Sequence, residues 1–240
     1  MTTQLQSAFD LLADASQRLT RTVDGFHGDD WTAPTRLPEW TRAHVVAHLA
    51  LNAEGIARCL RGVVADDPEE PATMYDSTEQ RDSDIAELAG RDPAEIRDRL
   101  LAATTLLHDA VLAVPDDGWE CRVERTPGGR SMPTSALPGM RLREVEIHHV
   151  DLAASYAVDD WPLAFAEHLL DAMSKRVDDG AAFEVKPLDS QRTWTFGEPD
   201  AEDTPVVTGP AGEIAWWLTG RTAAESVTSS RGALPEIGAW

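Results

Sequence analysis

The sequence predicts an α+β protein in which a bundle of four main helices precedes a small α/β domain. Apolar residues recur at helical spacing through most of the first 157 residues. From residue 158 onward, short β-rich runs alternate with Gly, Pro and Asp. The length of 240 residues also exceeds the usual single-domain range of roughly 100–200. We therefore expect a helical domain over 1–157 and an α/β domain over 158–240.

The helices of the first domain are recognised by their caps and stops. Gly25 follows the first apolar series, Thr41 can cap the second, and Gly62 follows it as a stop. Ser77 can cap a shorter helix, and Asp92 can cap a longer one that has Pro in its first position. The four main helices are expected over about 3–24, 41–61, 92–114 and 140–156.

Two connections in this domain have distinct compositions. Residues 65–75 are acidic and Pro-rich, which indicates a loop. Residues 116–138 hold three Pro and several Gly, so we expect a long crossover with a hairpin around 127–129. Four main helices with one long crossover are typical of a helix bundle.

The second domain is expected to mix helices with short strands. A helical pattern over 162–177 precedes β-rich runs at 183–185, 192–196 and 204–208. Pro210 then opens another helix, which ends near Gly220. This order of elements indicates a small α/β domain.

Composition excludes several classes of function. The chain has 21 Lys+Arg against 42 Asp+Glu, a formal charge of −21, which disfavours binding to nucleic acid or anionic lipid. No apolar run approaches the roughly 20 residues of a spanning helix, and the N-terminus does not resemble a signal peptide, so we expect a cytoplasmic protein. Cys59 and Cys121 lie 62 positions apart, outside any Cys-x-x-Cys motif, and are expected to be reduced thiols.

Polar residues on apolar helix faces indicate a metal site. Glu144 and His148 are four positions apart and share a helix face with apolar neighbours, while His48 falls on the apolar stripe of helix 41–61. Burying such groups without partners costs a few kcal/mol. A divalent metal would satisfy all three, and an N/N/O set with open positions is typical of catalytic zinc.

The spacing alone leaves other interpretations open. A Glu-x-x-x-His pair is often an exposed salt bridge, and a core-facing His is often a hydrogen-bonded structural residue. His44, one turn before His48, is a rival ligand. His149 is rotated off the Glu144 face and is expected to support the ligands or lie at the surface. The other histidines are expected to be ordinary surface or core residues: His27, His108 and His168.

Several segments resemble one known family. LPEWTRAHVVAHLALNAEG and MRLREVEIHHVDL resemble the two metal-bearing helices of the DinB-like, mycothiol-dependent maleylpyruvate isomerases, and PATMYDSTEQRDSDI, VTGPAGEIAWWLTGR and VTSSRG extend the resemblance over nearly the whole chain. The resemblance implies a DinB-like four-helix bundle and a sterol-carrier-like C-terminal domain that closes the active site. It also implies a divalent metal, typically zinc, held by His48, Glu144 and His148.

The resemblance further implies a thiol-assisted cis–trans isomerisation of maleylpyruvate, a ring-cleavage product of the gentisate pathway, to fumarylpyruvate. Reversible thiolate addition turns the double bond into a single bond that can rotate. A metal deprotonates a thiol whose free pKa is about 8.5. Since neither cysteine lies near the proposed ligands in sequence, the thiol is expected from mycothiol, a small-molecule cofactor.

Arginines are the expected partners of the dicarboxylate substrate, because a guanidinium binds a carboxylate in a bidentate manner. Arg81 and Arg221 match arginines of the family's active site and are expected to be catalytic. Asn52, one turn after His48, is expected to orient the cofactor or to hydrogen-bond a buried group.

Two other functions fit the same features. One is a mycothiol S-transferase acting on another electrophile, which the arginines disfavour; the other is a non-enzymatic metal-binding or regulatory protein. The expected partners are a small dicarboxylate and a low-molecular-weight thiol, with no nucleic acid and no membrane. A monomer is among the assemblies that the sequence allows.

Overall fold

The computed structural model describes residues 3–65, 72–175, 182–198 and 204–237. The chain divides into two compact units, Met1–Tyr156 and Ala157–Trp240, which are described separately below. No helix within the described ranges is both long enough and apolar enough to cross a bilayer.

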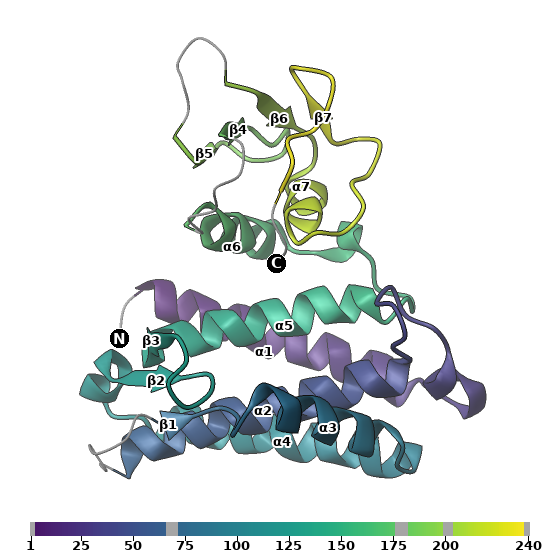
Figure 1. Cartoon of the computed structure of the whole chain (residues 1–240), viewed down its shortest axis with the longest axis vertical. Coiled ribbons are helices and arrows are strands. Elements are labelled where there is room, and N and C mark those ends of the chain that lie inside the picture. The colour runs from purple at the N-terminus through teal and green to yellow at the C-terminus, as the bar shows by residue number, and fades with distance from the viewer. Residues whose placement is uncertain (1–2, 66–71, 176–181, 199–203, 238–240) are drawn as a thin grey trace. The chain divides into compact units, whose positions relative to one another are not determined.

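The described residues of the first unit contain five α-helices, whose arrangement is shown in Figure 1. The predicted caps are confirmed: Ser77 Oγ accepts the backbone N–H of Gln80, and Asp92 accepts that of Ala94. Thr41 is the N-cap of the second helix. The helices are α1 (Thr3–Asp24), α2 (Arg42–Val64), α3 (Thr78–Ala89), α4 (Pro93–Ala113) and α5 (Leu137–Asp151).

Helix α2 is the centre of this unit because it packs against α3, α4 and α5, while α1 packs against α5. Leu49, Ile56 and Leu60 of α2 are at most 1% exposed, and burying each such side chain contributes about 1.5–3 kcal/mol. Small residues such as Ala53 and Ala57 let the neighbouring helices approach closely. Buried polar groups on this helix therefore face other helices rather than water.

The predicted extension of the last bundle helix to residue 156 is wrong, since α5 ends at Asp151. Ala153 adopts a φ of +50°, which interrupts the helix. Arg42 donates to the carbonyl oxygens of Leu152 (2.9 Å) and Ala153 (2.8 Å), which satisfies the backbone where the helix stops. A long-range arginine thus caps α5, and local sequence carries no sign of it.

The predicted hairpin is present between β2 (Arg122–Glu124) and β3 (Ser131–Pro133). A further strand, β1 (Ala72–Thr73), pairs in parallel with β2 inside the segment that was expected to be a loop. Residues 66–71 of that segment lie outside the described residues. Gly62 does not stop α2. A Cβ on it would come within 2.6 Å of Ala72 Cβ, so the glycine allows close approach instead.

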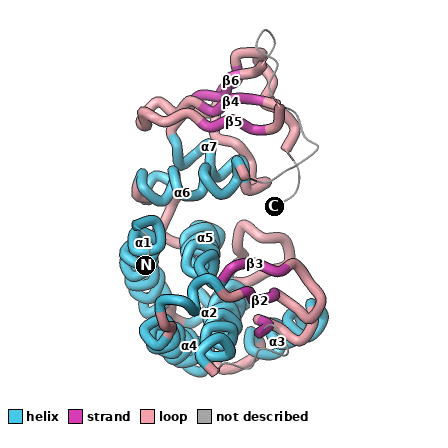
Figure 2. Tube along the Cα trace, turned by 90° about the vertical axis from the view of Figure 1, so that its left-hand side faces the viewer, coloured by secondary structure: helices cyan, strands magenta, loops and turns pink. Residues whose placement is uncertain are grey.

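The second unit places α6 (Leu163–Ser174) and α7 (Ala211–Leu218) on one face of a small sheet (Figure 2). The sheet order is β5-β4-β6-β7, in which β4 and β6 are parallel and the other pairs antiparallel. Three strands correspond to the predicted runs, and β7 (Thr228–Ser229) was not predicted. They are β4 (Phe183–Val185), β5 (Trp194–Phe196) and β6 (Val206–Thr208). Residues 176 and 177 of the predicted first helix lie outside the described residues.

Four short 3₁₀ helices complete the described elements. They are η1 (Gly28–Thr32), η2 (Asp116–Glu120), η3 (Thr134–Ala136) and η4 (Val158–Asp160).

Candidate metal centre

Two helices bring three candidate ligands together. Glu144 Oε2 lies 2.8 Å from His48 Nε2 on α2 and 3.4 Å from His148 Nε2, one turn along α5. The imidazole rings of His48 and His148 are nearly perpendicular, with centroids 4.8 Å apart. One ligand atom from each of the three residues lies within 4.8 Å of the other two. Both histidines are buried, and the Glu144 side chain is 20% exposed.

The donor set fits a divalent metal such as zinc. Zinc binds imidazole nitrogen and carboxylate oxygen at about 2.0–2.2 Å, so tetrahedral ligand atoms lie roughly 3.4 Å apart. The Glu144–His148 distance already has this value, and the Glu144–His48 distance of 2.8 Å needs only a small opening. Three protein ligands leave a coordination position for a water or another ligand.

The surroundings of His48 and Glu144 set the protonation state of each side chain. Burial lowers the pKa of His48 to about 4, so this imidazole is neutral at physiological pH. Burial acts to raise the pKa of Glu144, but hydrogen bonds with His148 and His48 outweigh it and hold that pKa well below its usual value. The carboxyl group is therefore ionised and ready to bind a cation.

Asp151 supports His148 from behind, a contact that the sequence analysis missed. Its carboxylate is fully buried, and its Oδ2 lies 2.9 Å from His148 Nδ1. Burial opposes ionisation of His148, yet the bonds to Asp151 and Glu144 prevail and raise its pKa. With Nδ1–H donated to a carboxylate, Nε2 is the nitrogen that can bind a metal, an arrangement common in metalloproteins. The i,i+3 spacing of His148 and Asp151 was the available signal.

Arg81 on α3 is brought to the cluster, as its predicted role requires. Its Nη2 lies 3.4 Å from His48 Nδ1, and its Nη1 lies 2.7 Å from Asp82 Oδ1. Since guanidinium can only donate, Nδ1 of His48 is the acceptor and Nε2 carries the hydrogen that Glu144 accepts.

Asn52 is held by a buried arginine. Arg141 on α5 is only 2% exposed, and its Nη1 donates to Leu49 O and to Asn52 Oδ1, both at 2.8 Å. Burial lowers the pKa of Arg141 to about 10, which leaves it charged. Asn52 Nδ2 donates in turn to the Tyr75 hydroxyl oxygen at 3.5 Å. Asn52 thus belongs to a hydrogen-bonded chain beside the cluster.

The other predicted histidines lie apart from the ligands. Nδ1 of His44 accepts the Thr41 backbone N–H at the start of α2. His149 is 1% exposed, so the expectation of a surface position is wrong; its Nε2 lies 2.7 Å from Thr22 Oγ1, and its ring stacks on Tyr156 at 3.9 Å. Three further histidines also lie outside the ligand cluster found among the described residues: His27 and His108, which are exposed, and His168, which is half-buried.

The candidate ligand cluster of the described residues contains neither cysteine. Cys59 is buried, and this raises the pKa of its thiol to about 12, so it remains protonated. Cys121 is exposed and lies at the start of the β2–β3 hairpin. The reduced state expected for both is the one described here.

Arg221 lies in the second unit, just after α7. Its guanidinium is 5.3 Å from the centroid of the Trp216 ring, and its Nη1 donates to Thr219 O at 3.0 Å. The stacking holds the cation on one face of the indole. Arg221 is thus fixed within its own unit.

Fold and site together define a helix-bundle protein with a three-residue cluster that could hold a metal ion and an appended α/β unit. A family model described as "Mycothiol maleylpyruvate isomerase N-terminal domain" matches residues 12–153, and one described as "MDMPI C-terminal domain" matches residues 160–239. The chain belongs to the mycothiol maleylpyruvate isomerase family.

The chain is also similar to solved structures and to other protein sequences. The chain is similar to a crystal structure of the mycothiol-dependent maleylpyruvate isomerase, with a TM-score of 0.87, 27% identity and complete coverage of both chains. A histidine-to-alanine mutant of that enzyme gives a TM-score of 0.85, with the same identity and coverage. Uncharacterized proteins of two Mycobacterium tuberculosis strains are 29% identical over 89% of this chain and 84% of theirs.

Proposed function

We propose that this protein is a metal- and mycothiol-dependent cis–trans isomerase that converts maleylpyruvate to fumarylpyruvate in the cytoplasm. One observation carries the proposal: a buried His48–Glu144–His148 cluster lies in a chain whose full length matches a mycothiol-dependent maleylpyruvate isomerase structure. We assign these three residues as the ligands of a divalent metal, zinc being the best candidate for the N/N/O donor set.

The chain's own residues hold this site in order. Asp151 orients the His148 ring, Arg81 lies beside the His48 ring, and Glu144 supplies the negative charge. A bound metal would lower the pKa of the mycothiol thiol, and the resulting thiolate, by adding reversibly to the substrate, would allow rotation about the former double bond. The thiol comes from outside the chain in this proposal, because the Cys59 thiol stays protonated.

Two arginines are proposed to bind the carboxylates of the substrate in this acidic protein. Arg81 lies beside the ligand cluster and is proposed to bind one substrate carboxylate. Arg221 is proposed to bind the other, with the second domain closing over the bundle. Asn52, which is hydrogen-bonded to Arg141 and Tyr75, is proposed to orient the cofactor.

The test combines purified protein, zinc, mycothiol at a tenth of the substrate concentration, and maleylpyruvate, and follows the ultraviolet change on isomerisation. Many turnovers per mycothiol are expected in the wild type and none in His148→Ala, which loses one of three ligands. Consumption of one mycothiol per product would instead indicate an S-transferase. Absence of any metal-dependent reaction would overturn the enzymatic proposal.

The role of Arg221 is tested separately. Arg221→Lys keeps the charge but loses the planar fork, so turnover should fall while zinc binding is unchanged. Arg231→Ala, an exposed arginine of the same unit, is the control. A kcat/KM for Arg221→Ala near the wild-type value at saturating mycothiol would remove Arg221 from the site.

A further inference from the structure

One donor nitrogen of Arg81, Nε, has no acceptor among the described residues. Its Nη1 is bound to Asp82 and its Nη2 to His48 Nδ1. Its Nε is buried and has no hydrogen-bond partner among the described residues. Buried donors are rarely left unpaired, so an unpaired one beside a proposed active site suggests that a ligand supplies the acceptor.

The Tyr75 hydroxyl is a second such donor, and its direction follows from the chain that ends on it. Arg141 can only donate, so the oxygen of the Asn52 side chain faces Arg141. The Asn52 amide nitrogen therefore faces Tyr75, whose oxygen is the acceptor of that bond. The Tyr75 hydrogen must point elsewhere, and no residue in the described part of the chain accepts it within hydrogen-bond distance.

Tyr75 lies next to Arg81, the residue that contacts the candidate ligand His48. The Arg81 guanidinium carbon is 5.8 Å from the centroid of its ring, and the negative charge of Glu144 acts on its hydroxyl. Its ring also lies close to Gly55 of α2: a Cβ on that glycine would lie 3.4 Å from Tyr75 Cε1. Gly55 is two helical turns beyond His48, or about 10 Å along the axis.

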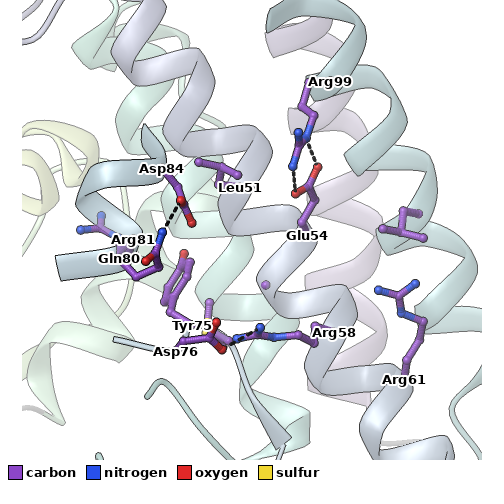
Figure 3. A pocket seen from close by; sticks show the side chains of 13 residues that line it. Leu51, Glu54, Arg58, Arg61, Tyr75, Asp76, Gln80, Arg81, Asp84 and Arg99 are labelled. Atoms are coloured by element: carbon purple, nitrogen blue, oxygen red, sulfur yellow. Dashed lines mark hydrogen bonds and ion pairs between the residues drawn. The ribbon is translucent and has the colours of Figure 1, made fainter. Parts of the chain in front are cut away.

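Tyr75 and Arg81 line one cavity of about 310 Å³ (Figure 3). Six other polar residues of this cavity pair with one another: Arg99 binds Glu54, Arg58 binds Asp76, and Gln80 binds Asp84. Tyr75 and Arg81 differ from these six because each has a donor without an acceptor in the described part of the chain, and Arg81 also contacts His48. Two neighbouring donors are suited to one oxygen that carries or develops negative charge.

We propose that the Tyr75 hydroxyl is a catalytic hydrogen-bond donor to the substrate carbonyl oxygen, assisted by Nε of Arg81; this rests on the proposed function. When a carbon–sulfur bond forms to the substrate's double bond, the π electron pair moves onto the conjugated carbonyl oxygen. Tyr75 stabilises that negative charge and keeps its proton. After rotation, the pair returns to re-form the double bond, and the carbon–sulfur bond breaks, so no proton or electron is gained or lost overall.

The test is Tyr75→Phe, which removes the hydroxyl and keeps the ring against Gly55 and Arg81. Loss of one such donor costs about 10²–10³-fold in kcat, so we expect a fall of about a hundredfold. The zinc dissociation constant, measured by competition with a chromophoric chelator, and the melting temperature should stay near wild type. The ultraviolet band of bound fumarylpyruvate should shift in the wild type and shift less in the variant, because Tyr75→Phe removes one of the two proposed donors to the carbonyl.

Tyr156→Phe is the matched control, since Tyr156 is the chain's other tyrosine and donates to the buried Glu146. It should lower the melting temperature and leave kcat unchanged. A kcat for Tyr75→Phe within threefold of wild type, or a loss of zinc affinity that accounts for the fall, would overturn the proposal. If the wild type shows no isomerisation, the proposed function itself is refuted. An unshifted ligand band in an active wild type refutes the role of Tyr75 alone.

Discussion

Replacing Asp151 by asparagine should weaken zinc binding about tenfold without unfolding the bundle. The Asp151 carboxylate is fully buried and lies 2.9 Å from His148 Nδ1. An asparagine oxygen can still accept the Nδ1–H, so Nε2 stays available to the metal. What is lost is the negative charge. A charge-assisted hydrogen bond is worth about 1.5–3 kcal/mol and a neutral one about 0.5–1.5, a difference of about 1–1.5 kcal/mol. This corresponds to roughly a fivefold to twelvefold change in the dissociation constant.

Asp151→Leu removes the acceptor as well. Loss of a residue that supports a metal ligand typically costs about 10–100-fold in metal affinity, and we expect the zinc affinity of Asp151→Leu to fall toward the hundredfold end of that range. The assay is zinc titration against a chromophoric chelator, with calorimetric unfolding of the metal-free proteins measured alongside. Glu87→Gln, which removes an exposed carboxylate paired with Arg91, is the control and should leave zinc affinity unchanged. Wild-type affinity in both Asp151 variants would refute the view that this carboxylate supports the metal.

The remaining predictions concern the ligands, pH and the thiol. His48→Ala should abolish stoichiometric zinc while His44→Ala retains it, because His44 is bonded to Thr41; zinc analysis of the dialysed proteins decides, and full occupancy in His48→Ala would move the ligand set. Because the pKa of His148 is raised, zinc must displace a proton from it at acidic pH, so the dissociation constant should rise, by at most about tenfold per pH unit for this one proton, as the pH falls below about 6.5; a constant affinity over that range would contradict the assignment. The Cys59→Ala, Cys121→Ser double variant should keep most of its turnover when mycothiol is supplied, and loss of turnover in a folded variant would point to a protein nucleophile.

The sequence predicted the metal-binding cluster because its three residues break an otherwise apolar pattern. Glu144 and His148 are four positions apart, and His48 lies on an apolar stripe, so each would be costly to bury alone. The caps at Ser77 and Asp92 could also be predicted from the sequence, since a cap depends on residues within one helical turn. Features of this kind can be predicted from the sequence because they depend on residues that are close together in it.

The parts that escaped prediction depend on contacts between distant segments. Arg42 ends α5 from 110 positions away, and Arg141 fixes Asn52 across 89 positions. Strand β1 exists only because β2 lies beside it, as two residues carry too little pattern to predict a strand. Asp151 was within reach of sequence reasoning. It was missed because a carboxylate at the end of a helix is ordinarily read as an exposed group.

A bound metal would also change the charge that a substrate meets at the cluster. Near the candidate ligands, the carboxylates of Glu144, Asp151 and Asp82 face the guanidiniums of Arg81 and Arg141 and the imidazole of His148, whose pKa is raised. These charges come close to balance in a protein of formal charge −21, so the metal-free site offers a dianion little net attraction. A divalent metal held there would add positive charge beside Arg81. We therefore expect the proposed substrate to need the metal for binding as well as for activation of the thiol, and dicarboxylate binding should weaken when zinc is removed.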